Sequence, residues 1–321
     1  MDWTKIKRNT IEAGKPPGVY ANLDDLIRIQ FKARDFSFLP RQPVTSILSG
    51  RYASRLRGRG LNFEELRRYM PGDDIRTMDW KVTARTRSPH VRVYTEEKDR
   101  SVVLIVDQRI NMFFGTRDKL KSVTAAEAAA LGVWRALDVG DRAGAVVFND
   151  TELVDIRPQR SQKTAMSILG TIVRMNHALH ADTAVEANPA ILNQALESAL
   201  QLISHDTLVV MISDFFGVDE QTERLTARMA EHNDVLALLV HDPIRLEPAV
   251  QNLTVSDGSR QMEIDFADKR VREKISQDYG DEQERIVHFL RKLAAPLLMI
   301  SNEGDVVDQV RRLLGVPGRV S

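Results

Sequence analysis

Two apolar runs, each closed by an aspartate, stand out in the pattern of hydrophobic and polar positions along the chain. The first covers residues 102–106 and leads into Asp107, and the second covers 208–212 and leads through Ser213 into Asp214. Unbroken apolar runs of this length are typical of strands buried on both faces, as in a parallel α/β sheet. Because such sheets bind ligands at the carboxyl ends of their strands, we expect these strands to be neighbours and their aspartates to meet at one rim.

Helical and strand periodicities alternate around these two runs. Helical spacing covers residues 23–36, 120–137, 161–176, 190–203, 219–231, 269–293 and 306–314, and further strand patterns cover 143–148, 153–156, 235–240 and 297–300. Thr116 is expected to cap the helix after the first strand, and Gly140 to end it. The alternation predicts an α/β fold, a doubly wound, mainly parallel sheet with right-handed crossovers.

This pattern divides the chain into three expected parts. Residues 1–43 are expected to form an N-terminal helical arm, 44–100 a smaller β-rich subdomain, and 101–315 the sheet domain. A hairpin insert is expected near 250–268, with Asp257 and Gly258 at its turn.

Charge is unevenly distributed although the chain as a whole is neutral. Residues 41–100 hold 14 lysines and arginines against 8 acidic residues, an excess of six positive charges. Such a segment favours an anionic partner, but pairing with the chain's own acids would explain it equally well. The orientation of four arginines would distinguish the two explanations: Arg51, Arg55, Arg57 and Arg59.

Composition excludes several classes of protein. The chain has no cysteine, so disulfides, thiolate metal sites and cysteine nucleophiles are ruled out. No apolar run approaches the ~18 residues of a membrane span, and the first residues lack the apolar core of a signal peptide, so we expect a cytoplasmic protein. The motifs of serine hydrolases, zinc proteases and dinucleotide-binding enzymes are missing, and we do not expect an enzyme.

A resemblance to a known family appears between the basic segment and the first strand. The string Tyr69-Met70-Pro71-Gly72-Asp73-Asp74-Ile75-Arg76-Thr77-Met78-Asp79-Trp80 resembles the Tyr-x-Pro-Gly-Asp-Asp-x-Arg-x-x-Asp-Trp signature of the family of unknown function numbered fifty-eight. The resemblance extends weakly over residues 45–315. Members of that family resemble von Willebrand factor A domains and are typically encoded near MoxR-type AAA+ ATPases, which implies an accessory protein acting with such an ATPase.

The family motif has two interpretations. Its residues Tyr69, Pro71, Gly72, Asp73, Asp74, Arg76, Asp79 and Trp80 either form a second functional surface or hold the two subdomains together. In the second interpretation Pro71 and Gly72 form a turn, the aspartates cap short helices, and Trp80 is buried.

The resemblance also implies a magnesium site that this chain has largely lost. In von Willebrand A domains the first strand ends in Asp-x-Ser-x-Ser, and a threonine and a second aspartate complete the site. Here the first motif reads Asp107-Gln108-Arg109-Ile110-Asn111, so both serines are replaced, and Arg109 cannot bind a metal. The position of the threonine falls at Ala190, with Thr183 upstream as the alternative.

Only Asp107, Asn111 and Asp214 therefore remain as candidate ligands of Mg²⁺, and we expect no cofactor. Two carboxylates about 4 Å apart repel each other by about 4 kcal/mol at an effective dielectric constant near 20. A metal ion or protonation of one acid would relieve this repulsion. Our hypothesis is that Arg109 relieves it instead, as a built-in cation between both acids.

Together these observations predict a non-enzymatic, cytoplasmic protein-interaction adaptor that works with a MoxR-like AAA+ ATPase in the assembly or maturation of a client protein. The expected contact surface is a degenerate metal-ion-dependent adhesion site formed by Asp107, Arg109, Asn111 and Asp214. The alternative is binding of nucleic acid or another anionic surface through residues 41–100. Interleaved acids and the lack of a known nucleic-acid-binding module make nucleic acid the less favoured partner.

Overall fold

Residues 17–33, 61–96, 100–180, 188–243, 252–256, 261–265, 269–292 and 295–314 are described by the structure, a computed structural model. The chain divides into a larger unit, Met1–Gln42 with Arg100–Ser321, and a smaller unit, Pro43–Asp99. Several residues singled out above lie outside the described ranges: Arg51, Arg55, Arg57, Arg59, Thr183, Asp257 and Gly258.

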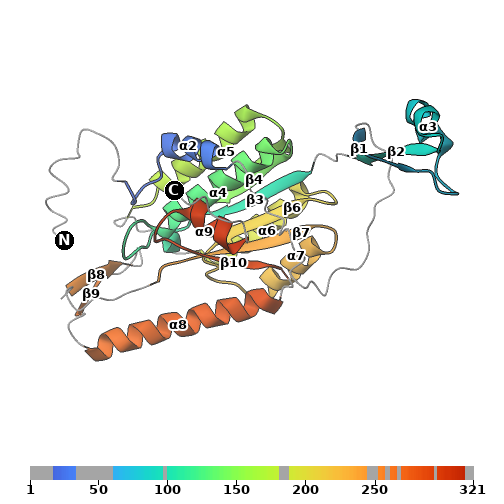
Figure 1. Cartoon of the computed structure of the whole chain (residues 1–321). Helices are drawn as coiled ribbons and strands as arrows, with labels where there is room; N and C mark the ends of the chain where they lie inside the picture. Colours follow the sequence, from blue (N-terminus) through green and yellow to red (C-terminus); the bar gives the residue numbers. More distant parts are fainter. Residues whose placement is uncertain are drawn as a thin grey trace. The chain divides into compact units, whose positions relative to one another are not determined.

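A six-stranded sheet forms the centre of the larger unit (Figure 1). Its strands are β3 (Ser101–Asp107), β4 (Arg142–Phe148), β5 (Leu153–Gln159), β6 (Leu208–Ser213), β7 (Asp234–His241) and β10 (Leu297–Ser301). They lie in the order β10-β7-β6-β3-β4-β5, and every neighbouring pair is parallel except β4 and β5. The expected doubly wound, mainly parallel sheet is confirmed.

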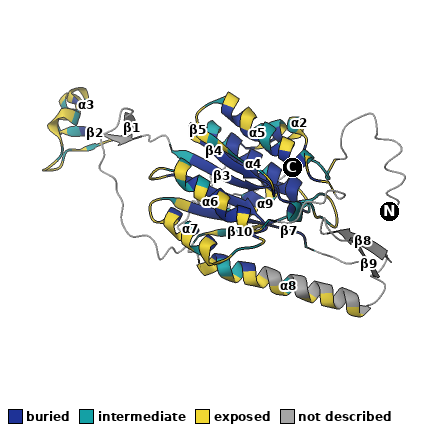
Figure 2. Ribbon diagram, turned by 180° about the vertical axis from the view of Figure 1, so that it is seen from behind, coloured by how far each residue is buried: buried dark blue, intermediate teal, exposed yellow. Residues whose placement is uncertain are grey.

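Helices of the described residues lie on both faces of this sheet: α4 (Lys121–Asp138), α5 (Gln162–His177), α6 (Ala190–Leu202), α7 (Glu220–Ala230), α8 (Lys269–Lys292) and α9 (Val306–Leu313). A further helix, α2 (Leu23–Lys32), packs on α4 and α5. Alternate side chains of β3 enter different cores. Leu104 packs with apolar residues of α2, α4, α5 and α9, whereas Ile105 packs with those of α6, α7 and α8. Figure 2 shows the strands and the inner faces of the helices as the buried part of this unit.

The N-terminal helix belongs to the larger unit instead of forming a separate arm. The indole Nε1 of Trp134, in α4, donates a hydrogen bond of 2.9 Å to the backbone oxygen of Leu26, in α2. Trp134 is buried, as expected of a core aromatic residue. Residues 34–36, which the sequence pattern added to this helix, lie outside the described residues.

The expected beginning of α4 is wrong. Thr116 does not cap the helix, which begins at Lys121 after an N-cap at Leu120 without a side-chain hydrogen bond. Instead, the backbone nitrogen and hydroxyl of Thr116 donate to the buried carboxylate of Asp242, at 2.6 and 2.7 Å. A buried carboxylate needs donors, and this long-range requirement overrides the local capping preference. The helix ends as expected, with Gly140 at a φ of 87° just beyond it.

Two smaller antiparallel sheets complete the described chain. In the larger unit β8 (Asn252–Ser256) pairs with β9 (Gln261–Asp265), which confirms the hairpin. In the smaller unit β1 (Leu61–Arg68) pairs with β2 (His90–Glu96). Between these two strands lie a 3₁₀ helix, η1 (Ile75–Thr77), and a short α-helix, α3 (Trp80–Thr86). Within the described ranges, no helix has the length and apolar character that crossing a membrane requires.

Candidate functional site

Asp107 and Asp214 lie side by side at the carboxyl edge of the sheet. Strands β3 and β6 pair in parallel with Val106 opposite Ile212, so the residues that follow meet at one rim, as predicted. Counted in chain order, the six strands lie as 3-2-1-4-5-6, and the order reverses between β3 and β6. This topological switch point is where doubly wound sheets form their ligand-binding crevice.

Arg109 holds Asp107 in a fully buried ion pair. Its Nη2 lies 2.7 Å from Oδ2 of Asp107, and its Nε lies 3.1 Å from both carboxylate oxygens. The backbone nitrogen of Arg109 donates to the same carboxylate at 2.9 Å, and the hydroxyl of Ser213 donates to it at 2.6 Å. Neither Asp107 nor Arg109 exposes any surface, so this pair is screened very little by solvent.

Asp214 is held by a different set of donors. Lys121, the first residue of α4, places its Nζ 2.6 Å from Oδ2 of Asp214. The side-chain amide of Asn111 donates to both carboxylate oxygens at 2.7 Å, and the backbone nitrogen of Phe216 donates at 3.1 Å. The Nη2 of Arg109 lies 4.0 Å from Oδ1 of the same group. The hypothesis expected one cation between the two acids, but the structure has two: Arg109 pairs directly with Asp107, and Lys121 pairs directly with Asp214.

Lys121 was not identified by the sequence analysis. A lysine at the beginning of a helix ordinarily reads as a solvated surface residue. Only the pairing of α4 with the end of β6, 93 positions later in the chain, gives it a buried partner.

The electrostatics of the rim keep these groups charged. Burial by itself would raise the pKa of Asp214, but Lys121 and then Arg109 more than offset this effect and hold that pKa below its usual value. For Arg109, burial acts to lower the pKa, and the charge and hydrogen bonds of Asp107 reverse the direction, so the pKa is raised. Each of the two carboxylates thus has a basic side chain as its direct partner.

Asp150 is a third acid of the rim that the sequence analysis missed. It lies just beyond β4, and its carboxylate accepts hydrogen bonds from the backbone nitrogens of Ile110, at 2.6 Å, and Asn188, at 2.9 Å. Burial raises its pKa despite these bonds. Asp150 thereby ties the loop after β3 to the segment that precedes α6.

The donor set does not fit a magnesium ion. Mg²⁺ requires oxygen ligands in near-octahedral geometry, but the carboxylates of Asp107 and Asp214 already accept bonds from two side-chain cations. Asn111 directs its amide nitrogen at Asp214, and Ala190 offers no side-chain oxygen. Within the described ranges no three His, Asp or Glu side chains are grouped so that they could hold a metal. The guanidinium of Arg109 and the ammonium of Lys121 already pair with the two carboxylates that a divalent cation would need as ligands.

Two phenyl groups flank the charged cluster and reach the surface. Phe216 is 39% exposed and follows Asp214, and Phe114 is 36% exposed, with its ring centroid 5.9 Å from Nζ of Lys121. Phe215, which stands between Asp214 and Phe216 in the chain, is buried and has a φ of 57°, a left-handed conformation that strains a bulky residue. Its backbone nitrogen donates to the hydroxyl of Ser213 at 2.8 Å, which helps to hold this turn.

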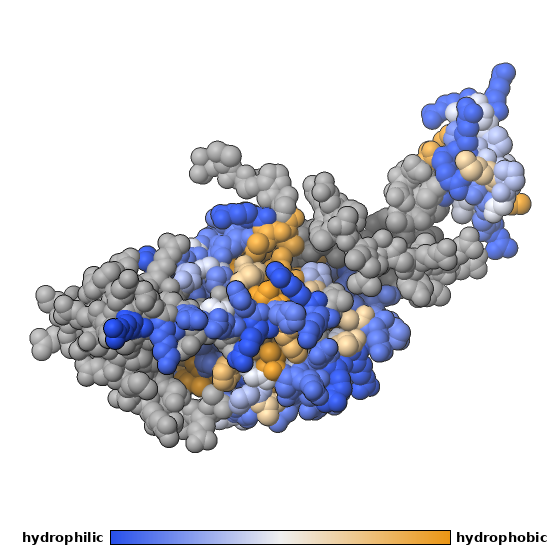
Figure 3. All heavy atoms as spheres, turned by 90° about the horizontal axis from the view of Figure 1, so that it is seen from below, coloured by the Kyte–Doolittle hydropathy of each residue, from blue (hydrophilic) through white to orange (hydrophobic). Residues whose placement is uncertain are grey.

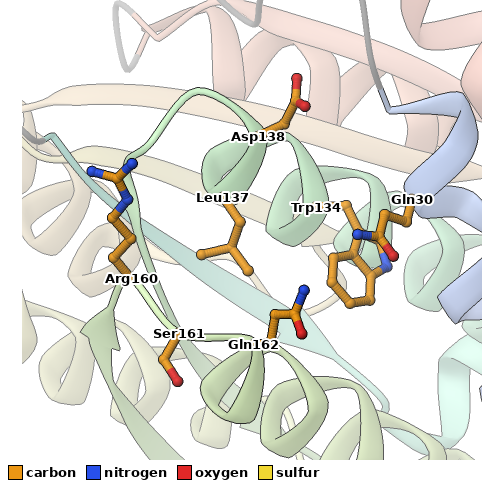
Figure 4. A pocket seen from close by; sticks show the side chains of 7 residues that line it. All are labelled: Gln30, Trp134, Leu137, Asp138, Arg160, Ser161 and Gln162. Atoms are coloured by element: carbon orange, nitrogen blue, oxygen red, sulfur yellow. The ribbon is translucent and has the colours of Figure 1, made fainter.

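A pocket of about 210 Å³ lies away from the rim. Figure 4 shows its lining side chains: Gln30, Trp134, Leu137, Asp138, Arg160, Ser161 and Gln162. These residues come from α2, the second half of α4, and the connection from β5 into α5, at the amino-terminal edge of the parallel strands. No residue predicted for the site lines this pocket, and its volume is below the ~300 Å³ at which small-molecule sites usually begin.

In the smaller unit the motif aspartates are structural. Asp73 makes a two-pronged ion pair with Arg67, at 2.7 and 2.8 Å. The Oδ1 of Asp79 caps α3 by accepting two backbone bonds of 3.0 Å, and its Oδ2 lies 2.7 Å from Nη2 of Arg92. These bonds lower the pKa of Asp73, through Arg67 first, and the pKa of Asp79, through the backbone of Val82 first.

The expected burial of Trp80 is wrong, because its side chain is 67% exposed. Trp80 is the first residue of α3, and the half-buried side of that helix is formed by Val82 and Thr83. The aspartate before it is buried instead, because it both caps the helix and pairs with Arg92.

Comparison with known proteins gives relatives over most of the chain. Two uncharacterized mycobacterial proteins, Rv1480 of Mycobacterium tuberculosis and Mb1516 of Mycobacterium bovis, are each 28% identical over 301 residues, 93% of this chain and 93% of theirs. Among solved structures, the conserved hypothetical protein BatB from Bacteroides thetaiotaomicron is 12% identical, with a TM-score of 0.42 over 67% of this chain and 97% of that one. The VWA domain of SpRpn10 is also 12% identical, with a TM-score of 0.38 over 70% and 100%.

A family model also matches residues 65–285, which include the end of β1, the motif of the smaller unit and both strands of the rim. That match spans more than half of the chain. The protein belongs to the family described as "Protein of unknown function DUF58".

Proposed function

We propose that this protein is a non-enzymatic, cytoplasmic adaptor that works with a MoxR-like AAA+ ATPase in the assembly or maturation of client proteins. The partner comes from the family resemblance. The contact surface that we assign to it, the rim, comprises the exposed phenyl groups of Phe114 and Phe216 and the edge of the charged cluster of Asp107, Arg109, Asn111 and Asp214, in which Asp107 and Arg109 are wholly buried and support the surface from within. One observation carries the proposal: the charges at the switch point of the sheet are neutralised by the protein's own side chains.

The pairing of these charges favours a role in binding a partner protein over a role in proton transfer. A general acid or base works best when its pKa lies near the operating pH and when a substrate can reach it. Asp214 has a lowered pKa and accepts bonds from Lys121 and Asn111, while Asp107 is wholly buried beneath Arg109. The cluster is therefore better suited to shaping a rigid surface than to reacting.

The exposed phenyl groups give that surface a binding character. Interface hot spots combine large apolar or aromatic side chains with nearby charged groups that lose water on binding. The ring of Phe114 lies near Lys121, and the exposed Phe216 follows Asp214 and bonds to it through its backbone nitrogen, so both belong to the neighbourhood of this ion pair. A partner that covers the phenyl groups would also cover the edge of the charged cluster.

The test is recovery of the neighbouring MoxR-like ATPase on the immobilised full-length protein. The double variant Phe114→Ser/Phe216→Ser is expected to bind the ATPase at least about thirtyfold more weakly than the wild type, because even one hot-spot residue contributes about 2 kcal/mol or more. Met166, in the first half of α5, is similarly exposed at 37%, and Met166→Ser is the matched control that should bind normally.

Two results would count against the proposal. If the wild type recovers no ATPase, the partnership is wrong. If the double variant recovers as much as the wild type, the partner binds elsewhere and the rim is not the contact. A parallel comparison with Asp214→Ala separates the charged cluster from the phenyl groups.

A further inference from the structure

The smaller unit exposes three large apolar side chains within its family motif. Met70 is 63% exposed, Ile75 62% and Trp80 67%. They lie in the turn after β1, in η1 and at the beginning of α3. None of them is needed to fill a core, so the surface that they form calls for another explanation.

The same stretch of sequence also carries exposed basic side chains. Five exposed basic residues have no ion pair or side-chain hydrogen bond with any described residue: Arg68, Arg76, Lys81, Arg85 and Arg87. By contrast, Asp73 and Asp79 already bind Arg67 and Arg92. Asp73 and Asp79 thus neutralise other arginines, and the exposed Asp74, which caps η1, is the one further acid among the five cations, so the segment from Arg68 to Arg87 keeps an excess of positive charge.

The short helix α3 joins the two kinds of side chain on one face. At about 100° per residue, Trp80, Ala84, Lys81 and Arg85 fall within an arc of roughly 140°. All four are exposed, whereas Val82 and Thr83, on the other side, are half-buried. An aromatic anchor and two cations therefore project from the same side of the helix. Figure 3 shows, in the face that it presents, the smaller unit as largely hydrophilic with separate apolar patches.

We propose that the exposed side of α3, Trp80 with Lys81 and Arg85, binds the surface of an anionic phospholipid bilayer, and that Met70, Ile75 and the other three cations of the same unit add further contacts. Tryptophan favours the boundary between headgroups and acyl chains, where its ring is apolar and its N–H stays hydrated. Each Lys or Arg near an anionic leaflet adds about one kilocalorie per mole of attraction, which is about fivefold in affinity. Apolar anchors combined with basic side chains are the combination that holds interfacial segments on membranes.

The exposed aliphatic side chains favour lipid over nucleic acid. Nucleic-acid surfaces combine cations with aromatic rings that stack on bases, and here Trp80 is largely exposed whereas Tyr69 is half-buried. Met70 and Ile75 gain nothing from stacking, but they lose unfavourable contact with water when they enter the headgroup region. The proposal is independent of the adaptor function, since it uses no residue of the rim.

The experiment is co-sedimentation of the full-length protein with vesicles of equal parts phosphatidylcholine and phosphatidylglycerol, compared with phosphatidylcholine alone. We expect binding to the anionic vesicles only, weakening as salt is raised. Trp80→Ser should lower the affinity about tenfold. Lys81→Ala/Arg85→Ala should lower it about thirtyfold, from the loss of two charges.

Matched controls separate a local surface from overall charge. Arg224 and Arg228 are exposed on α7 with the same spacing of four residues, so Arg224→Ala/Arg228→Ala removes the same charge from the larger unit. This variant should bind within about twofold of the wild type, as should Lys81→Arg/Arg85→Lys, which keeps the charge. Unchanged thermal unfolding confirms that each variant is folded.

Three outcomes would overturn the proposal. One is absence of binding to anionic vesicles. Another is binding that survives both Trp80→Ser and Lys81→Ala/Arg85→Ala. The third is binding of a single-stranded oligonucleotide that depends on Lys81 and Arg85 while vesicle binding does not, which would make the surface a nucleic-acid interface.

Discussion

At the scale of single residues, Arg109 and Lys121 determine the character of the rim. Arg109 could be identified from the sequence, because it occupies a serine position of a recognisable strand-end motif. Lys121 could not, because its role depends on an ion pair across 93 positions of the chain that no local pattern encodes. Trp80 was misjudged for a related reason: burial of an aromatic side chain depends on which side of a short helix faces the sheet.

Lys121→Met is predicted to destabilise the protein by about 3–5 kcal/mol at pH 7, because it leaves the charge of Asp214 buried without its nearest cation. The pKa of Asp214 is lowered in the folded wild type, so its pairing stabilises the fold above the unfolded pKa and is lost as pH falls through the folded pKa. The difference between variant and wild type should therefore narrow below about pH 4.

Urea unfolding at several pH values measures this difference in the free energy of unfolding. Asp214→Asn combined with Lys121→Met serves as the control, since it removes the unpaired charge and should recover part of the lost stability. A difference that stays constant from neutral to acidic pH would show that Lys121 acts through packing and not through Asp214.

At the scale of elements, the strands could be predicted nearly residue by residue. Buried parallel strands are short, continuous apolar runs, and these are visible in any window of the sequence. The neighbouring positions of β3 and β6 also followed, because an aspartate after each run indicated one shared rim. The first residue of α4 could not be predicted, because Thr116, the expected cap, donates instead to the buried carboxylate of Asp242, which is distant in the sequence.

Two glycines give opposite predictions for helix stability. Gly170 lies inside α5 with nothing within 4 Å of an added Cβ, so Gly170→Ala should stabilise the fold by about 0.5–1 kcal/mol. Gly140 has a φ of 87° just after α4, and an added Cβ would lie 3.1 Å from the guanidinium of Arg160. Gly140→Ala should therefore destabilise the fold by about 1 kcal/mol.

Thermal unfolding of the two variants measures both effects. For a protein of this size each kilocalorie per mole corresponds to a shift of about 2–4 °C in Tm. Equal shifts of the same sign would contradict the assignment of Gly140 to the left-handed position that ends α4.

At the scale of the whole molecule, the fold class was within reach of the sequence, whereas the packing of the N-terminal helix into the larger unit and the nature of the binding surfaces were not. The alternation of helix and strand dictates the doubly wound sheet, and its switch point dictates where the rim lies. Whether the rim is charged, neutral or metal-binding depends on which side chains converge there. Whether the basic segment is internally paired depends likewise on contacts such as Arg67 with Asp73 and Arg92 with Asp79.

The defining feature of the rim is that the protein's own cations stand where von Willebrand A domains bind a metal ion. Calorimetric titration of the full-length protein with Mg²⁺ tests this claim directly. With Arg109 on Asp107 and Lys121 on Asp214, the wild type is predicted to give only the heat of dilution. Micromolar binding of Mg²⁺ that Asp214→Ala abolishes would contradict the account.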